Sequence, residues 1–129
     1  MIEEVLHSLG ITSNYVGYKQ AVLALQLALD DESRLYAANR RIYRVVAEEL
    51  SCSAYSVERN FRTIIDRAWK FDKQRVIQMA GFEMVVSPSV VRFLSILVVY
   101  IQRKLGLSYE LASARACRSI RQNERDDLQ

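Results

Sequence analysis

The stretch Asn39–Lys70, NRRIYRVVAEELSCSAYSVERNFRTIIDRAWK, decides the fold of this chain. Apolar residues recur at helical spacing on both sides of a short polar segment, Ser-Cys-Ser. The pattern predicts a helix over 40–50 capped by Asn39, a tight turn, and a second helix from Ala54 to about Phe71 capped by Ser53. This layout is typical of a helix-turn-helix, in which the second helix lies in the DNA major groove and the first crosses the backbone.

Three residues within the stretch have the spacing that such a motif needs for packing. Ala47 lies where the two helices must approach closely, because a larger side chain would hold them apart. Ser51 occupies the turn, where many helix-turn-helix proteins place Gly, and Val57 points back into the angle between the helices. Many helical hairpins would match two of these points, so the prediction depends on all three together.

The second helix has an apolar stripe and an opposite, polar face that could contact DNA. Arg59 and Arg62 can grip guanine O6 and N7, and Glu58 can accept a hydrogen bond from cytosine N4. An ordinary solvated face is the alternative, because Glu58 and Arg62 at i,i+4 also form a common surface ion pair. Within a helix-turn-helix, base reading by these three residues is the preferred interpretation. The residues expected to support it or to contact phosphates are Arg40, Arg41, Arg44, Ser53, Tyr55, Ser56, Thr63 and Lys70.

The composition favours one all-helical domain. The chain has 129 residues, half of them hydrophobic, with one Pro and four Gly, and few breakers favour helices over sheets. A net charge of +3 is too small by itself to indicate nucleic acid, but residues 34–75 carry ten bases and five acids, whereas residues 1–33 carry one base and five acids. The basic part of the chain therefore contains the predicted DNA reader.

The rest of the chain also reads as helices. They are expected over 2–9, 16–29, 30–38 and 72–79, with stops at Gly10 and Gly81. Ser87 and Pro88 are expected to cap a helix over 89–105, which Gly106 ends, and Ser108 is expected to cap a last helix over 109–122. The predicted fold is an all-α, compact multi-helix domain over 1–129, with a helix-turn-helix at about 40–70, two extra C-terminal helices over 87–123 and a frayed tail over 124–129.

The helix over 89–105 is apolar nearly all round. A membrane span needs about 20 apolar residues, and this run is shorter and contains Arg92, so a membrane helix is rejected. We expect the helix to be buried in the fold or against a partner. On the last helix, a row of arginines has two interpretations, phosphate contact or a solvated basic face: Arg115, Arg118, Arg121 and Arg125.

Nothing in the sequence indicates an enzyme. His7 is the only histidine, Cys52 and Cys117 are far apart, and there is no Gly-rich phosphate loop, so we expect no catalytic site, metal, cofactor or small-molecule substrate. The N-terminus has no basic region followed by an apolar run, so we expect a reduced cytoplasmic protein without a signal peptide.

The run from Val5 to Trp69 resembles the C-terminal DNA-binding effector domain of stage-zero sporulation protein A, the response regulator that launches sporulation in endospore-forming Firmicutes. The likeness continues more weakly to about Phe82, so residues 1–82 are taken as the effector-like part. It implies an all-helical fold that recognises a short DNA box, with molecules able to sit head-to-tail on tandem boxes and base contacts from Glu58, Arg59 and Arg62. The residues that carry it are LHSLGI at 6–11, Gly17, Tyr18, Asp30, Asp31, Tyr43, Ala47, Val57, Glu58, Arg59, Arg62, Ala68 and Trp69.

Two departures from that family bear on function. The family usually has Ser-Arg where this chain has Tyr55 and Ser56, so a basic side chain is missing at the start of the reading helix, although Tyr55 could touch a phosphate or stack on a sugar. Full-length family members also carry an N-terminal phospho-acceptor receiver domain. This chain begins almost directly with the effector part, so we expect binding that receiver phosphorylation does not switch.

These observations predict a bacterial transcription regulator related to sporulation control that binds double-stranded DNA sequence-specifically. The expected partners are DNA and a second copy, as a homodimer or in tandem head-to-tail assembly, with the apolar helix from Ser89 as a candidate surface. The alternative is a protein-interaction module on the same fold that docks on another regulator or on RNA polymerase, with weak or no DNA binding. The change at Tyr55 and Ser56 favours that alternative.

Overall fold

The computed structural model describes the backbone of residues 1–116 and the side chains of residues 1–106. Every regular element in this part of the chain is helical, which confirms the predicted all-α fold. The elements are α1 (Ile2–Ser8), α2 (Tyr18–Asp30), the 3₁₀ helix η1 (Glu32–Ala37), the π-helical turn η2 (Asn39–Tyr43), α3 (Arg44–Glu49), α4 (Ala54–Ala80) and α5 (Val90–Ala116).

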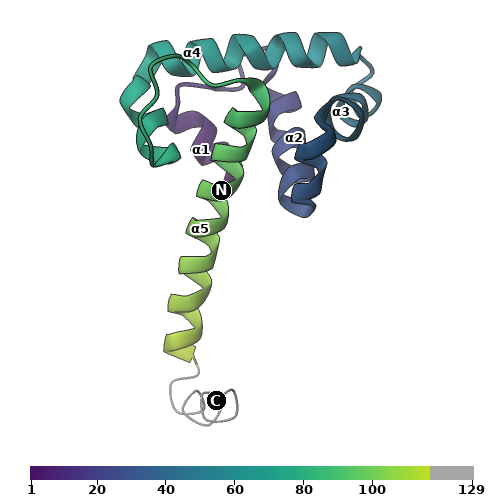
Figure 1. The fold of residues 1–129 in the computed structure, drawn as a ribbon. Helices are drawn as coiled ribbons and strands as arrows, with labels where there is room; N and C mark the ends of the chain where they lie inside the picture. Colours follow the sequence, from purple (N-terminus) through teal and green to yellow (C-terminus); the bar gives the residue numbers. More distant parts are fainter. Residues whose placement is uncertain (117–129) are drawn as a thin grey trace.

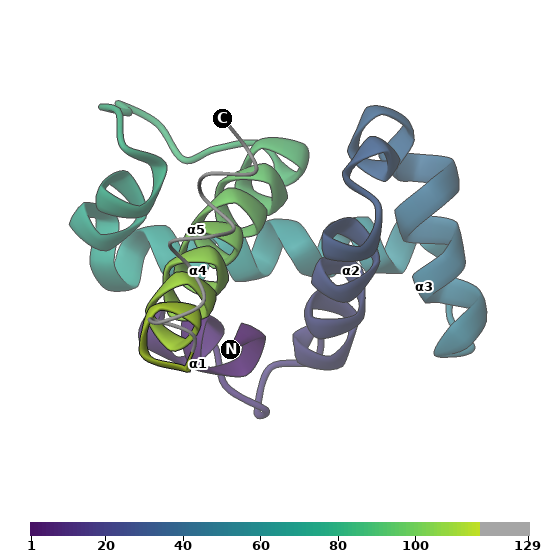
Figure 2. The ribbon, with the colours of Figure 1, turned by 90° about the horizontal axis from the view of Figure 1, so that it is seen from below.

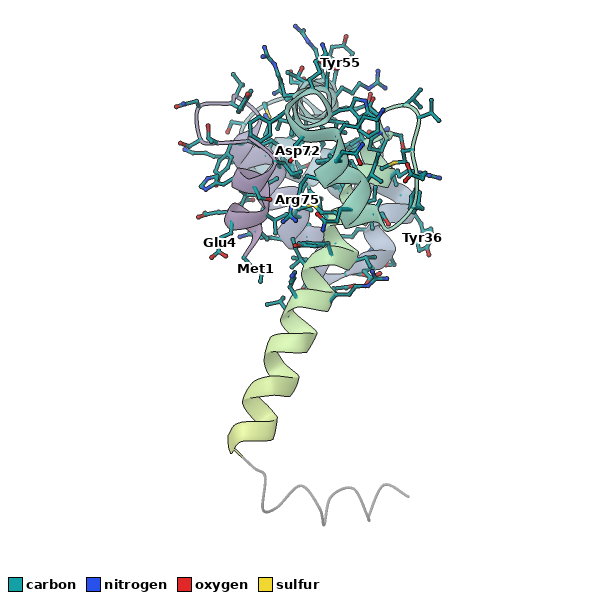
Figure 3. The ribbon with its side chains drawn as sticks, turned by 90° about the vertical axis from the view of Figure 1, so that its left-hand side faces the viewer. Met1, Glu4, Tyr36, Tyr55, Asp72 and Arg75 are labelled. Atoms are coloured by element: carbon teal, nitrogen blue, oxygen red, sulfur yellow. The ribbon has the colours of Figure 1, made fainter. Side chains whose placement is uncertain are left out.

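Helix α4 forms one end of the molecule. It runs across the top in Figure 1, and α1, α2, α3 and α5 lie beneath it. Viewed from below, α4 passes behind the other helices (Figure 2), so only one of its faces packs on the rest of the fold. Helix α5 starts against α4 and leads away from it, past the ends of the other helices (Figures 1 and 3).

The core lies between α4 and the helices beneath it. Burial of these apolar side chains supplies most of the stabilising free energy, at roughly 25 cal/mol per Å² removed from water. All the predicted apolar positions of the reading helix, residues 57, 61, 64, 65 and 68, are buried. The largest fully buried side chains are Leu6, Leu9, Ile11, Leu25, Ile42, Leu97, Ile101, Val46, Val57 and Val98.

The prediction of two C-terminal helices was wrong, because α5 is one continuous helix from Val90 to Ala116. Gly106 lies within it and does not adopt the left-handed conformation, whereas Gly10 and Gly81, with φ of +79° and +80°, do and end α1 and α4. A glycine inside a helix costs only about 1 kcal/mol relative to alanine, so without a left-handed cap it does not terminate the helix. The backbone at Ser108 lies inside this helix and does not begin a new one. The arginine side chains from Arg115 onward and the predicted tail lie outside the described residues.

Two predicted caps were also wrong. Asn39 does not cap, because Ala38 before it is already helical (φ −57°, ψ −40°) and the chain continues through η2 into α3 without a break. At α5 the capping residue is Ser89, whose Oγ accepts a hydrogen bond from the Arg92 backbone N–H at 3.3 Å. Ser87 and Pro88 lie before this cap.

Helix α4 contains a kink where the sequence predicts the end of the reading helix. Asp72 has extended backbone angles (φ −156°, ψ 80°) between two helical segments. Its Oδ1 accepts a hydrogen bond from the Arg75 N–H at 3.0 Å, so Asp72 caps the second segment. The chain therefore forms one unbroken helical segment over 54–71 before the kink.

No helix in the part of the chain that the structure describes is long and apolar enough to cross a lipid bilayer.

Candidate nucleic-acid interface

The helix-turn-helix is built as its packing residues predict. Ala47 and Val57 are both buried between the two helices. The turn is tight because Ser51 adopts a left-handed conformation (φ 55°) and the Cys52 N–H donates to the Ala47 carbonyl at 2.9 Å. Ser53 caps α4, with its Oγ accepting a hydrogen bond from the Ser56 N–H at 3.1 Å.

The outer face of α4 is uncovered by any described segment (Figures 1 and 3). Tyr55 projects from the end of the molecule opposite the C-terminal part of α5 (Figure 3) and is 75% exposed. Arg59 and Thr63 lie further along the same face and are exposed as well. A rigid helix that presents polar side chains in this way has the shape that fits the major groove.

Of the three predicted base-reading residues, Arg59 makes no salt bridge with a described residue, whereas Glu58 and Arg62 pair with each other. Glu58 Oε1 lies 2.9 Å from Arg62 Nη2, with side chains 39% and 71% exposed. Both residues border the cleft next to residues 87–91, before and at the start of α5. The structure therefore shows the surface ion pair, which was the alternative interpretation of these two residues, and base reading by them stays a prediction.

Tyr43 is a neighbour of this pair that the site prediction missed. It is buried, packs edge-on against Phe61 with ring centroids 5.8 Å apart, and borders an open cleft of about 430 Å³ together with Glu58, Arg62 and residues 87–91. Burial raises the pKa of Tyr43 to about 12, and the nearby Glu58 carboxylate adds to the rise while Arg62 opposes it. Tyr43 thus forms the buried side of the cleft that Glu58 and Arg62 also border.

Arg41 differs from the other predicted phosphate contacts because it is held within the fold. Its guanidinium lies 2.9 Å from Asp31 Oδ2 and donates to Ser33 Oγ at 2.9 Å. The Ser33 hydroxyl and backbone N–H, followed by Arg41, lower the pKa of Asp31 below its usual range. Arg41 therefore ties η2 to the end of α2.

The remaining supporting residues are exposed or close to the surface. Arg40 and Arg44 are exposed on the first helix of the motif. Lys70 forms a surface pair with Asp66 at 3.2 Å, and Thr63 Oγ1 donates to the Arg59 carbonyl at 3.3 Å. Such surface pairs are weak, at about 0.5 kcal/mol or less, so Lys70 can exchange Asp66 for a phosphate at little cost.

The structure also places the residues that could bind a metal ion or act as nucleophiles. The described residues contain no group of three or more His, Cys, Asp or Glu side chains placed to hold a metal ion. His7 stacks on Tyr18, with its Nε2 3.2 Å from the tyrosine hydroxyl. Cys52 is exposed in the turn of the motif.

A comparison with known protein families agrees with this arrangement. The family described as "Sporulation initiation factor Spo0A C terminal" matches residues 2–105. The match extends beyond Phe82, where the resemblance in the sequence was expected to end. It includes the part of α5 that packs in the core, so this part belongs to the family's domain and is not an addition to it. This chain therefore belongs to the family of the C-terminal domain of the sporulation initiation factor Spo0A.

Proposed function

We propose that this protein binds double-stranded DNA sequence-specifically, with the outer face of the segment 54–71 of α4 in the major groove. The observation that carries the proposal is that this face is free of other segments and presents Arg59 without an ion-pair partner among the described residues. Membership in the family of a sporulation regulator's DNA-binding effector domain supports it, and so does the concentration of basic residues at 34–75.

Arg59 is the principal reader in this proposal. Its guanidinium can donate two parallel hydrogen bonds to guanine O6 and N7, the pairing that best distinguishes one base pair from another. Among the described residues, no carboxylate pairs with Arg59 and would have to be displaced first. The missing basic residue at Ser56 makes the protein depend more strongly on Arg59.

Glu58 and Arg62 act as a unit in this proposal. A carboxylate has two oxygens that together accept several hydrogen bonds, so Glu58 can keep Arg62 and also accept from cytosine N4. Arg62 holds the Glu58 carboxylate in place and reduces its repulsion from nearby phosphates. The pair thus supplies a second, adjacent reading position.

Phosphate contacts set the register of the helix in the groove. Those assigned to this role are exposed or at the N-terminus of α4: Arg40, Arg44, Ser53, Tyr55, Ser56, Thr63 and Lys70. Arg41 is left out of the set, because its release would break the contacts with Asp31 and Ser33. As a transcription regulator related to sporulation, the molecule would gain affinity from a second copy bound to an adjacent, head-to-tail DNA box.

The test is selection of duplexes from a random pool, followed by affinity measurements at several salt concentrations. Arg59→Ala should lower the affinity for the selected duplex by about 1–3 kcal/mol and abolish the preference for it. Lys70→Ala should weaken binding to all duplexes alike and reduce the salt slope by about one. Arg103→Ala is the matched control, because Arg103 is exposed on α5, away from α4.

A second candidate function is a protein-interaction module that docks on another regulator or on RNA polymerase. The observation that favours it is apolar surface around the connection from α4 to α5, where Val85 and Val86 are exposed. Next to them, Met79, Phe82 and Val99 border an open groove of about 610 Å³. Absence of binding to any duplex at low salt would exclude the first function and leave this one.

A further inference from the structure

Helix α2 lies outside the helix-turn-helix but carries a polar side chain that reaches into it. Gln20 is 7% exposed and is the one buried polar or charged residue among those described. Other polar residues of α2, such as Lys19 and Gln26, are exposed, so the sequence alone does not distinguish Gln20 from them. A buried amide is costly unless its hydrogen bonds are made, so its partners are informative.

Both partners of Gln20 belong to the DNA-reading motif. The Asn60 Nδ2 on α4 donates to Gln20 Oε1 at 3.0 Å. The Gln20 Nε2 donates to Cys52 Sγ, in the turn, at 3.5 Å. If the Gln20 amide were turned over, both contacts would persist, since a thiol can donate or accept and the Asn60 amide offers both kinds of group.

The backbone of α2 is pressed against α4 at the same place. A Cβ on the buried Gly17 would lie 2.9 Å from Asn60 Cβ and 2.9 Å from Ile64 Cδ1, so no side chain fits there. Gly17 thus brings the start of α2 into direct contact with α4. Gln20, one turn further along, then bridges from Asn60 to the turn.

We infer that Gln20 is a positioning residue for DNA reading, which locks the turn at Cys52 and the recognition helix at Asn60 to one orientation. Apolar packing alone is non-directional and tolerates small shifts, whereas two hydrogen bonds from one buried amide are directional. Asn60 is adjacent to Arg59, so a shift of α4 at this point moves the principal reading side chain. A bidentate contact to a base needs its donor placed to within about 0.5 Å.

This inference rests on the proposed DNA binding, and its test therefore includes a measurement made without DNA. Gln20→Met keeps the length of the side chain and removes both polar atoms. Gln26→Met is the matched control, because Gln26 is exposed on the same helix. Amide hydrogen exchange of residues 50–60 is measured in the free protein. The ratio of affinities for selected and scrambled duplexes is measured under conditions in which each variant is fully folded.

For Gln20→Met we expect the exchange rates of amides in the inter-helix turn and at the start of α4 to rise by about tenfold. The affinity ratio should also fall by about tenfold, because the loss corresponds to roughly one net hydrogen bond. Gln26→Met should change neither quantity. Cys52→Ser, which keeps a donor and an acceptor in the turn, should stay close to wild type. If Gln20→Met does not fold, Asn60→Ala removes the same bond from the other end and takes its place.

Each remaining outcome overturns part or all of the inference. Unchanged exchange in Gln20→Met would show that Gln20 does not hold the turn. Raised exchange with an unchanged affinity ratio would show a tie that stabilises the fold without positioning the reader. If the wild type binds no duplex, the proposed function fails, while the exchange measurement still decides whether Gln20 holds the motif together.

Discussion

Helices α4 and α5 have the same length, 27 residues each, yet they respond to their predicted break points in opposite ways. Helix α4 bends at Asp72, an ordinary residue with a capping side chain, whereas α5 continues past Gly106, the residue expected to end it. The difference shows that a weak helix former does not end a helix by itself. A break needs a side chain or backbone that satisfies the exposed N–H or C=O groups in another way.

The two helices also differ in how much of their surface is buried. Helix α4 buries one stripe and leaves its outer face uncovered by the described segments. The first half of α5 packs against α1, α2 and α4, with Leu97, Val98 and Ile101 fully buried. Helix α5 therefore anchors the fold, and α4 presents an uncovered polar face.

The largest expected effect is the loss of stability when a buried side chain of α5 is removed. Leu97→Ala should reduce the free energy of unfolding by about 2–5 kcal/mol, because it removes a fully buried side chain and leaves a cavity. Val99→Ala on the same helix is the control, since Val99 is 38% exposed. Chemical denaturation measures both variants, and equal losses would mean that α5 does not anchor the core as described.

A smaller loss should follow removal of the cap at the kink. Asp72→Ala should destabilise the protein by about 0.5–2 kcal/mol, because the Arg75 N–H loses its acceptor. Asp72→Asn, which keeps an acceptor oxygen, should lose much less. A fully stable Asp72→Ala protein would indicate that packing alone produces the bend.

Gly106 and Gly81 form a matched pair that tests whether α5 is continuous, because a Cβ at either meets no atom within 4 Å. Gly106→Ala should raise stability by about 0.5–1 kcal/mol, since the residue is helical. Gly81→Ala should lower it by about 1–2 kcal/mol, since φ there is +80°. Thermal unfolding would test the signs, and a destabilising Gly106→Ala would contradict a continuous helix.

The smallest expected effect is on the pH dependence of stability and concerns Tyr43, in the cleft bordered by α4 and the start of α5. Its pKa is raised from 10.0 to about 12, so its contribution to stability is fully present below pH 10 and is lost as the pH rises toward 12. Tyr43→Phe should therefore lose less stability than wild type over that range. Denaturation curves of both proteins at about pH 9 and about pH 11 would measure the difference. Equal losses of the free energy of unfolding between these pH values would show that Tyr43 titrates normally.

The sequence determined the helix-turn-helix and most of its surroundings. The apolar stripe of the reading helix, the small residue at Ala47, the turn at Ser51 and the cap at Ser53 all appear in the structure as predicted. These features depend on hydrogen bonds and spacings within a few residues, so the local sequence contains the information for them.

Only the tertiary structure decided which polar side chains pair with residues of other elements and which remain exposed. The pairing of Arg41 with Asp31, the place of Tyr43 beside Glu58, and the contacts of Gln20 with Asn60 and Cys52 join residues from different elements. The local sequence also did not determine that α5 continues past Gly106, because a glycine can either end a helix or lie within it. Helical periodicity specifies which face of a helix is apolar, but the neighbours of each polar group depend on how the helices pack.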